Sequence, residues 1–95
     1  MTDCCIIGGG AVGLSIAREL AGRGLSVRVL ARDRGRDTTS WAAAGILPPA
    51  PTFPGMSAGE ALTAWSDRLL RRWSDELREE TGIDVGLREC GGLHV

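Results

Sequence analysis

The sequence predicts an α/β fold, and three of its segments lead to this prediction. Residues 3–7 are a short apolar run that ends in glycine, residues 11–23 carry apolar positions at helical spacing, and residues 26–31 are a second apolar run. A strand, a helix and a strand of this length form one right-handed βαβ unit. The remaining residues are expected to add an amphipathic helix and a short terminal strand pair.

The first apolar run is typical of a central parallel strand. It shows no alternation of apolar and polar residues, which is expected where both faces of a sheet are covered. Cys4 and Cys5 lie in this run and Cys90 lies near the end of the chain. Neighbouring strand residues point to opposite faces, so Cys4 and Cys5 do not pair readily. We expect the three cysteines to be small buried apolar residues, with a redox or metal role as the alternative.

The helix and the second strand follow from spacing and from residue type. The apolar positions of the helix are Val12, Ile16, Ala17 and Leu20, and charged residues take the opposite side. Gly22 and Gly24 mark its end. Ser26 to Ala31 then contains the β-forming residues Val27, Val29 and Leu30 before a polar stretch begins.

A second helix is predicted further along the chain. Residues 48–55, PPAPTFPG, contain all four prolines and are expected to be irregular. Ser57 and Glu60 have the spacing of a capping box, and Gly82 is placed to end the helix as a left-handed cap. The apolar stripe of this helix is Leu62, Trp65, Leu69, Trp73 and Leu77. We interpret its tryptophans as core anchors, with a binding role as the alternative.

The end of the chain is expected to be extended. Ile83 to Val95 is predicted to form two short strands that meet near residues 91–92. The only histidine, His94, lies in this segment, and a single strand histidine is more often structural than catalytic.

Length and charge exclude several classes of protein. A chain of 95 residues forms one small domain at most and buries only a thin core. Its 11 basic and 12 acidic residues give a net charge of −1 without a basic block, so no nucleic-acid partner is expected. The apolar runs are too short to span a membrane, and the first residues lack the pattern of a signal peptide. A cytoplasmic location is therefore expected.

Residues 8–13, GGGAVG, match the dinucleotide-binding pattern G-x-G-x-x-G between the first strand and the helix. Gly8 permits a tight turn, Gly10 allows a pyrophosphate to approach the backbone, and Gly13 lets the helix pack closely on the strand. The free N–H groups and the dipole at the helix start attract phosphates. The motif predicts a dinucleotide without identifying which one.

The end of the second strand gives conflicting signals about the nucleotide. A carboxylate there normally binds the adenosine ribose, whereas arginine suits the 2′-phosphate of NADP. Ala31 and Arg32 stand at this place, which favours NADP, and Asp33 replaces the missing acid only if the strand bends early.

Residues 39–47, TSWAAAGIL, lead from a polar turn into a segment of small side chains. Few side chains would obstruct the approach of its backbone N–H groups to a flat ligand. The alternative is an alanine-rich helical turn, because alanine is the best helix former.

The ordered combination of these motifs resembles a known family. The opening GGGAVGLSIARELAGRG, the later TSWAAAGIL and the closing TGID…CGGLHV are similar to the N-terminal part of the FAD-dependent D-amino-acid oxidase (DAO) family, most closely the glycine oxidases of thiamine biosynthesis. The resemblance implies a Rossmann-like FAD-binding unit and an amino-acid substrate. The reaction it implies is oxidative deamination, in which a hydride passes from the substrate α-carbon to the flavin and O₂ reoxidises the cofactor.

The resemblance also implies roles for individual residues. Ala11 and Val12 match turn residues against the FAD pyrophosphate, and Ala31 and Arg32 match the strand end at the ribose. Thr39 and Ser40 match a hydroxyl pair near the pyrophosphate, and Ala44 to Ile46 match backbone positions that line the flavin. The predicted cofactor site comprises Gly8, Gly10, Ala11, Val12, Gly13, Ala31, Arg32, Thr39, Ser40, Ala44, Gly45 and Ile46.

Two departures from the family pattern complete the prediction. The family's acid at the ribose is replaced by Ala31, and the substrate domain, with the arginine and tyrosine that hold the substrate carboxylate, is not found in residues 1–95. We expect these residues to be the N-terminal part of an FAD-binding domain, a fragment or truncated product that is inactive by itself, and no catalytic residue is assigned. Self-association through the helix at residues 57–81 is expected, because part of its apolar stripe stays exposed. The alternative functions are an NADP-binding reductase module and an interaction protein that uses Trp65 and Trp73.

Overall fold

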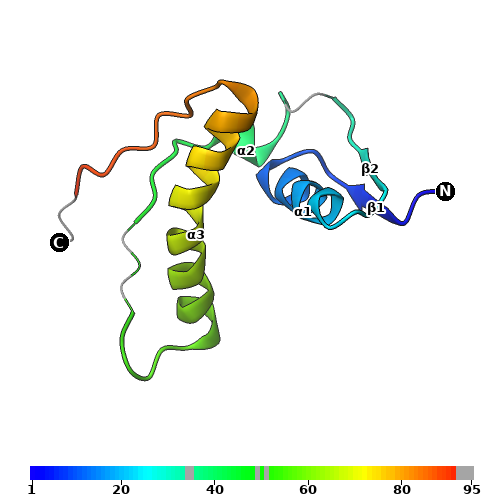
Figure 1. The fold of residues 1–95 in the computed structure, drawn as a ribbon. Helices are drawn as coiled ribbons and strands as arrows, with labels where there is room; N and C mark the ends of the chain where they lie inside the picture. The colour runs from blue at the N-terminus through cyan, green and yellow to red at the C-terminus, as the bar shows by residue number, and fades with distance from the viewer. Residues whose placement is uncertain (34–35, 49, 51, 92–95) are drawn as a thin grey trace. The chain divides into compact units, whose positions relative to one another are not determined.

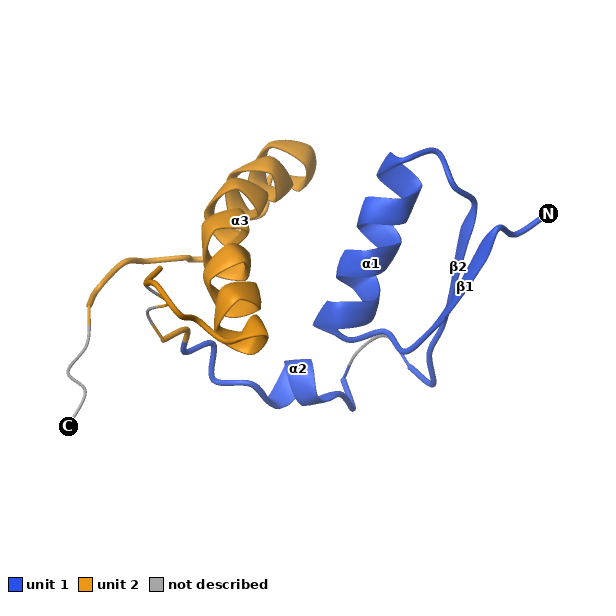
Figure 2. Ribbon diagram, turned by 90° about the horizontal axis from the view of Figure 1, so that it is seen from below, with its two compact units in different colours: residues 1–46 blue, residues 47–95 orange. Residues whose placement is uncertain are grey.

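The computed structural model of the chain describes residues 1–33, 36–48, 50 and 52–91 (Figure 1). The elements follow one another as β1 (Cys4–Ile7), α1 (Ala11–Gly22), β2 (Val27–Leu30), α2 (Thr39–Ala42) and α3 (Ala58–Thr81). The chain divides into two compact units, residues 1–46 and 47–95, which Figure 2 shows in blue and orange. The first unit contains β1, α1, β2 and α2, and the second contains α3.

The first unit is built on a parallel pair of strands. β1 pairs with β2 so that Cys4 lies beside Val27 and Ile6 beside Val29. Helix α1 connects the two strands, and the α/β class and the βαβ start are therefore confirmed. The strands are each one or two residues shorter than expected, because pairing covers only residues 4–7 and 27–30.

Only one face of this small sheet is covered. Cys4 and Ile6 are half-buried on the side of α1, whereas Ile7 is 87% exposed and Leu30 is 50% exposed on the other side. The prediction of a strand covered on both faces is wrong for the described residues. An apolar sequence shows that a strand gains from burial, but it does not show whether a second layer covers the strand. For the same reason Cys5 is exposed and not buried as predicted, and Cys90 is exposed as well.

Helix α1 packs on the sheet along a line that differs from the predicted one. Gly13, Ala17 and Leu20 are half-buried, at the spacing of one helix face. Val12 is 76% exposed and Ile16 is 47% exposed, although both belong to the predicted apolar face. The glycine sets the line of closest approach, because its missing side chain lets the helix axis lie near β1 there.

Helix α3 begins and ends at the predicted residues. The Ser57 hydroxyl accepts a hydrogen bond from the Glu60 N–H at 3.3 Å, and Glu60 Oε2 accepts one from the Ser57 N–H at 2.8 Å, which completes the capping box. Gly82 adopts φ 74° and donates its N–H to the Arg78 carbonyl. Both caps satisfy backbone groups that a helix end leaves without partners.

We expect Ser57→Ala to destabilise α3 by about 1 kcal/mol, the usual loss when a hydroxyl N-cap is removed. Hydrogen bonds from Ser57 also hold the pKa of Glu60 below its ordinary value. A carboxylate with a lowered folded-state pKa stabilises the fold above its unfolded pKa, and this contribution disappears as the pH falls through the acid range. The variant should therefore have a lower free energy of unfolding at neutral pH, and its difference from the wild type should shrink as the pH is lowered. Circular dichroism with denaturant measures both. Ser66→Ala, within the helix, is the matched control, and equal stability of the two variants would contradict the prediction.

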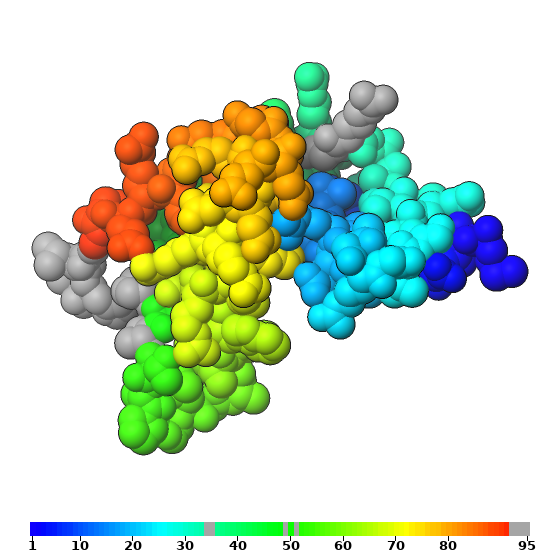
Figure 3. All heavy atoms as spheres, in the orientation of Figure 1, coloured from blue at the N-terminus to red at the C-terminus, as the bar shows by residue number. Residues whose placement is uncertain are grey.

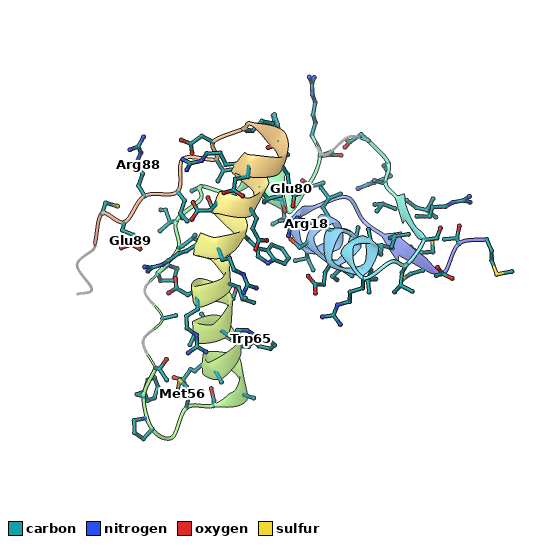
Figure 4. The ribbon with its side chains drawn as sticks, in the orientation of Figure 1. Arg18, Met56, Trp65, Glu80, Arg88 and Glu89 are labelled. Atoms are coloured by element: carbon teal, nitrogen blue, oxygen red, sulfur yellow. The ribbon has the colours of Figure 1, made fainter. Side chains whose placement is uncertain are left out.

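The apolar stripe of α3 is only partly covered. Ala64 is 3% exposed and is the one buried apolar residue among those described, whereas Leu62 is 64% exposed and Trp65 is 57% exposed. Trp65 projects away from the helix (Figure 4), and the side chains of α3 form an outer surface of their unit (Figure 3). The interpretation of Trp65 as a core anchor is therefore wrong, while the expected exposure of part of the stripe is confirmed. Self-association through this helix stays a prediction.

The residues after α3 do not form the predicted strand pair within the described part of the chain. Residues 83–91 have no helix or strand, and residues 92–95, which include His94, lie outside the described residues. A strand needs a hydrogen-bonded neighbour, and the sheet of the described residues contains only β1 and β2. The proline segment is irregular as expected at residues 48, 50 and 52–55, and residues 49 and 51 lie outside the description. None of the described helices has the length and apolar character that crossing a membrane requires.

Candidate nucleotide-binding site

The glycine loop joins the end of β1 to the start of α1. Gly8 has φ 119°, a value that favours glycine, and its N–H donates to the Leu30 carbonyl at 2.8 Å. Gly10 is the N-cap of α1 and has extended backbone angles. Its carbonyl accepts the Leu14 N–H at 3.0 Å, which closes the first turn of the helix. The loop is therefore fixed to β2 at one end and to α1 at the other.

Two glycines of the motif lie where a side chain would meet other atoms. A Cβ at Gly13 would overlap the Gly8 carbonyl oxygen and would lie 3.2 Å from the Gly8 carbonyl carbon. This contact is the close approach of helix to strand that the third glycine was predicted to allow. A Cβ at Gly10 would lie 3.1 Å from Ser40 Oγ. The space beside Gly10 is thus bounded by a movable hydroxyl and not by backbone.

The start of α1 is oriented to attract an anion. Gly10 offers no side-chain cap, and the first turn contains no acidic residue. Ser40 Oγ accepts a hydrogen bond from the Ala11 N–H at 2.8 Å, although the two residues are 29 positions apart. A hydroxyl can turn away, so the N–H groups of the first turn and the positive end of the helix dipole fit a pyrophosphate at this place.

The end of β2 lies at the surface. Ala31, Arg32 and Asp33 are all exposed. Asp33 Oδ1 accepts a hydrogen bond from the Arg36 N–H at 3.1 Å, so this carboxylate already has a partner three residues along the chain. The structure therefore engages Asp33 locally, and the strand end itself carries the methyl group of Ala31 and the guanidinium of Arg32.

The TSWAAAGIL segment combines both predicted conformations. Thr39–Ala42 forms the single helical turn α2, whose N-cap is Thr38, and the Thr38 hydroxyl accepts the Trp41 N–H at 3.1 Å. The helical alternative therefore holds for these residues only. Ala43 returns to extended angles, Gly45 has φ 74°, and Ile46 is 83% exposed. Residues 43–46 thus present an irregular, open backbone.

The contacts bring together one part of the predicted site. Ala11 is hydrogen-bonded to Ser40, and the Cβ positions of Gly10 and Gly13 lie against Ser40 and Gly8. Val12 and Thr39 are exposed, and a Cβ built on Gly45 meets no atom within 4 Å. The sequence interpretation named Ser40 without its bond to Ala11, and it missed the Thr38 hydroxyl. Thr38 had a local signal in its position three residues before Trp41, whereas the bond from Ala11 to Ser40 joins distant residues and has none.

A parallel βαβ unit with a glycine loop at the start of its helix is consistent with a nucleotide-binding unit of the Rossmann-like type. A family model described as "FAD dependent oxidoreductase" matches residues 3–95. The chain therefore belongs to this family of FAD-dependent oxidoreductases, and FAD is its cofactor, as predicted.

Individual relatives are consistent with the family. The chain is 40% identical over 91 residues to the bifunctional protein ThiO/ThiG of Nostoc sp.. This alignment covers 96% of the chain and 14% of that protein. It is 39% identical over 89 residues to a glycine oxidase of Geobacillus kaustophilus, with 94% of the chain and 24% of that protein covered. A glycine oxidase of Pseudomonas aeruginosa is 35% identical over 86 residues, with 90% of the chain and 24% of that protein covered. The chain thus spans 14–24% of the length of these relatives. No solved structure matches it.

Proposed function

We propose that residues 1–95 are the N-terminal FAD-binding part of an amino-acid oxidoreductase similar to glycine and D-amino-acid oxidases, which acts by oxidative deamination. The observation that carries the proposal is the glycine loop at the start of α1, closed by Ser40 at the Ala11 N–H, in a chain of this family. A loop that leaves helix N–H groups facing one movable hydroxyl suits a pyrophosphate better than it suits a turn without a ligand.

Different residues of the site are proposed to bind different parts of FAD. In this proposal Gly10, Ala11 and Val12 bind the pyrophosphate through backbone N–H groups, with Thr39 and Ser40 beside them. Ala31 and Arg32 meet the adenosine ribose. The open backbone of Ala44, Gly45 and Ile46 lines the flavin. FAD supplies the hydride acceptor for oxidation of the substrate, and the protein positions it.

The proposed substrate is a small amino acid. Its chemical class is taken from the names of the relatives, which include a glycine oxidase. Two other functions each have one observation in their favour. Exposed Arg32 beside Ala31 suits the 2′-phosphate of NADP, and Trp65 at 57% exposure suits an interaction surface.

The test is to identify the nucleotide that the protein holds. We expect the purified chain, or the chain with FAD added, to retain a yellow flavin through gel filtration and to release FAD on denaturation. Calorimetry with NADPH is the parallel measurement. Tight NADPH binding without retained flavin would replace the proposal by the reductase function, and binding of neither nucleotide would favour the interaction protein.

We expect Ala31→Glu to tighten FAD binding by about tenfold, which corresponds to one net hydrogen bond of ~1.4 kcal/mol to a ribose hydroxyl. Ala31 is exposed at the strand end, so a longer side chain has room to extend, and Asp33 is engaged with the Arg36 N–H. Fluorescence titration with FAD measures the effect, and Ala61→Glu on α3 is the matched control. An unchanged dissociation constant would indicate that backbone groups or Asp33 already serve the ribose.

We also expect the 95-residue chain by itself to oxidise no amino acid. The proposed flavin-lining segment is open to water, as Ile46 at 83% exposure shows, and hydride transfer needs a substrate held in line with the cofactor. The measurement is a peroxide-coupled assay with glycine, sarcosine and D-alanine in the presence of FAD. Turnover by the purified chain above the rate of free FAD would contradict this expectation.

A further inference from the structure

Gly9 lies inside the glycine loop at a position that the dinucleotide pattern leaves unspecified. Its environment in the structure is nevertheless restrictive. Gly9 is half-buried, and a Cβ at this residue would lie 3.0 Å from the Cβ of Ala31, which is tighter than ordinary van der Waals contact. The neighbouring atom belongs to a side chain with no torsion that can move it aside.

The Gly9 contact is separate from the backbone conformation of the residue. Gly8 requires a positive φ of 119°, but Gly9 is not among the positive-φ glycines. An alanine at position 9 would therefore be acceptable to its own backbone and would be opposed only by Ala31. This makes the residue a clean probe of one contact.

Ala31 bounds the loop at Gly9 on one side, and Ser40 is hydrogen-bonded to it at Ala11 on the other. The Gly8 N–H is bonded to Leu30 O, the residue before Ala31, and the Ala11 N–H is bonded to Ser40 Oγ. Gly9 thus lies where the loop crosses the end of β2, between these two anchors. A shift of the loop away from Ala31 would carry the N–H groups of Gly10 and Ala11 with it.

We propose that Gly9 and Ala31 act as a pair that positions the phosphate-binding loop, in which the Cβ of Ala31 leaves room for glycine and for no larger residue at position 9. The proposal rests on the FAD site described above. It also gives Ala31 a second role: its methyl group is the surface on which the loop lies, in addition to its place beside the ribose.

The test is a double-mutant cycle read by FAD titration. Gly9→Ala should raise the FAD dissociation constant by about tenfold, since overpacking a close contact costs about that much. Ala31→Gly alone is the reference for the double variant: Gly9→Ala should cost much less affinity when it is combined with Ala31→Gly than in the wild-type chain, because the space is restored. Gly22→Ala is the matched control, because nothing lies within 4 Å of a Cβ there and its φ is not positive. The overturning results are wild-type affinity in Gly9→Ala or a double variant no better than it.

A second measurement separates the pair from the proposed cofactor. Hydrogen exchange of the Gly8 N–H, which is bonded to Leu30 O, should speed up in Gly9→Ala and return to the wild-type rate in the double variant. If the wild-type chain binds no FAD, the proposed function is wrong. The exchange rates of the Gly8 N–H then still show whether Gly9 and Ala31 position the loop. Should Gly9→Ala fail to fold, a folded double variant supports the pair and an unfolded one overturns it.

Discussion

Gly13→Ala is expected to destabilise the βαβ unit severely. The new methyl group would overlap the carbonyl oxygen of Gly8, and it would lie in ordinary contact with Ile6 Cγ2 at 3.4 Å. The first contact is with backbone, so no side-chain rotation relieves it, and α1 must move off β1. Overpacking of this severity costs about 3 kcal/mol or more. That is a large part of the roughly 5 kcal/mol expected for a small fold.

Hydrogen exchange across the β1–β2 pair measures this effect. The strand amides of residues 27–30 should lose protection in Gly13→Ala, while the amides of α3, which belong to the other compact unit, keep theirs. Gly22→Ala places the same methyl group on the same helix with nothing within 4 Å, and it should leave protection unchanged. Retained protection in Gly13→Ala would mean that helix and strand separate at little cost and that the glycine is not required for packing.

Elements whose signals are local could be predicted from the sequence. The capping box of Ser57 and Glu60 placed the start of α3, and Gly82 placed its end, because each cap is formed by residues within one turn. The parallel pairing of β1 and β2 followed from strand length and from the helix between them. These features depend on neighbours along the chain, and the sequence contains those neighbours.

Burial could not be predicted in the same way. An apolar side chain indicates what a residue gains if it is covered, but the covering layer comes from other segments. Cys5 and Ile7 are apolar strand residues that lie on an open face of the sheet, and Trp65 has the spacing of a core residue and is 57% exposed. Val12 shows the same limit within α1, since the buried line of the helix is set by Gly13 and not by the largest side chains.

The candidate site divides along the same lines. The glycine pattern predicted the loop and the roles of Gly8 and Gly13 in its geometry, because those roles follow from backbone conformation and close approach. The hydrogen bond between Ala11 and Ser40, and the closeness of Ala31 to the Cβ position of Gly9, involve residues far apart in sequence, and no local pattern predicts them. These proximities follow from the three-dimensional structure and not from neighbouring residues in the sequence.

Gly10→Val is expected to abolish FAD binding while the βαβ unit stays folded. Gly10 has φ −83° and ψ −174°, which valine adopts without strain, so the backbone does not oppose the change. The nearest atom to a new Cβ is Ser40 Oγ at 3.1 Å, the end of a side chain that can rotate. The branched side chain would instead occupy the space in front of the Ala11 N–H, where the pyrophosphate is proposed to bind.

The contrast with Gly13 makes the Gly10 variant a test of the site and not of the fold. Circular dichroism and strand-amide exchange should match the wild-type chain, and FAD titration should show no saturable binding. Gly22→Val is the matched control, since it introduces the same side chain where nothing lies within 4 Å, and it should bind FAD as the wild type does. Because the pyrophosphate must come within hydrogen-bonding distance of the helix N–H groups, a valine that blocks this approach cannot be accommodated by a small shift of the ligand. Wild-type affinity in Gly10→Val would place the nucleotide elsewhere and leave the glycine loop as a turn between β1 and α1.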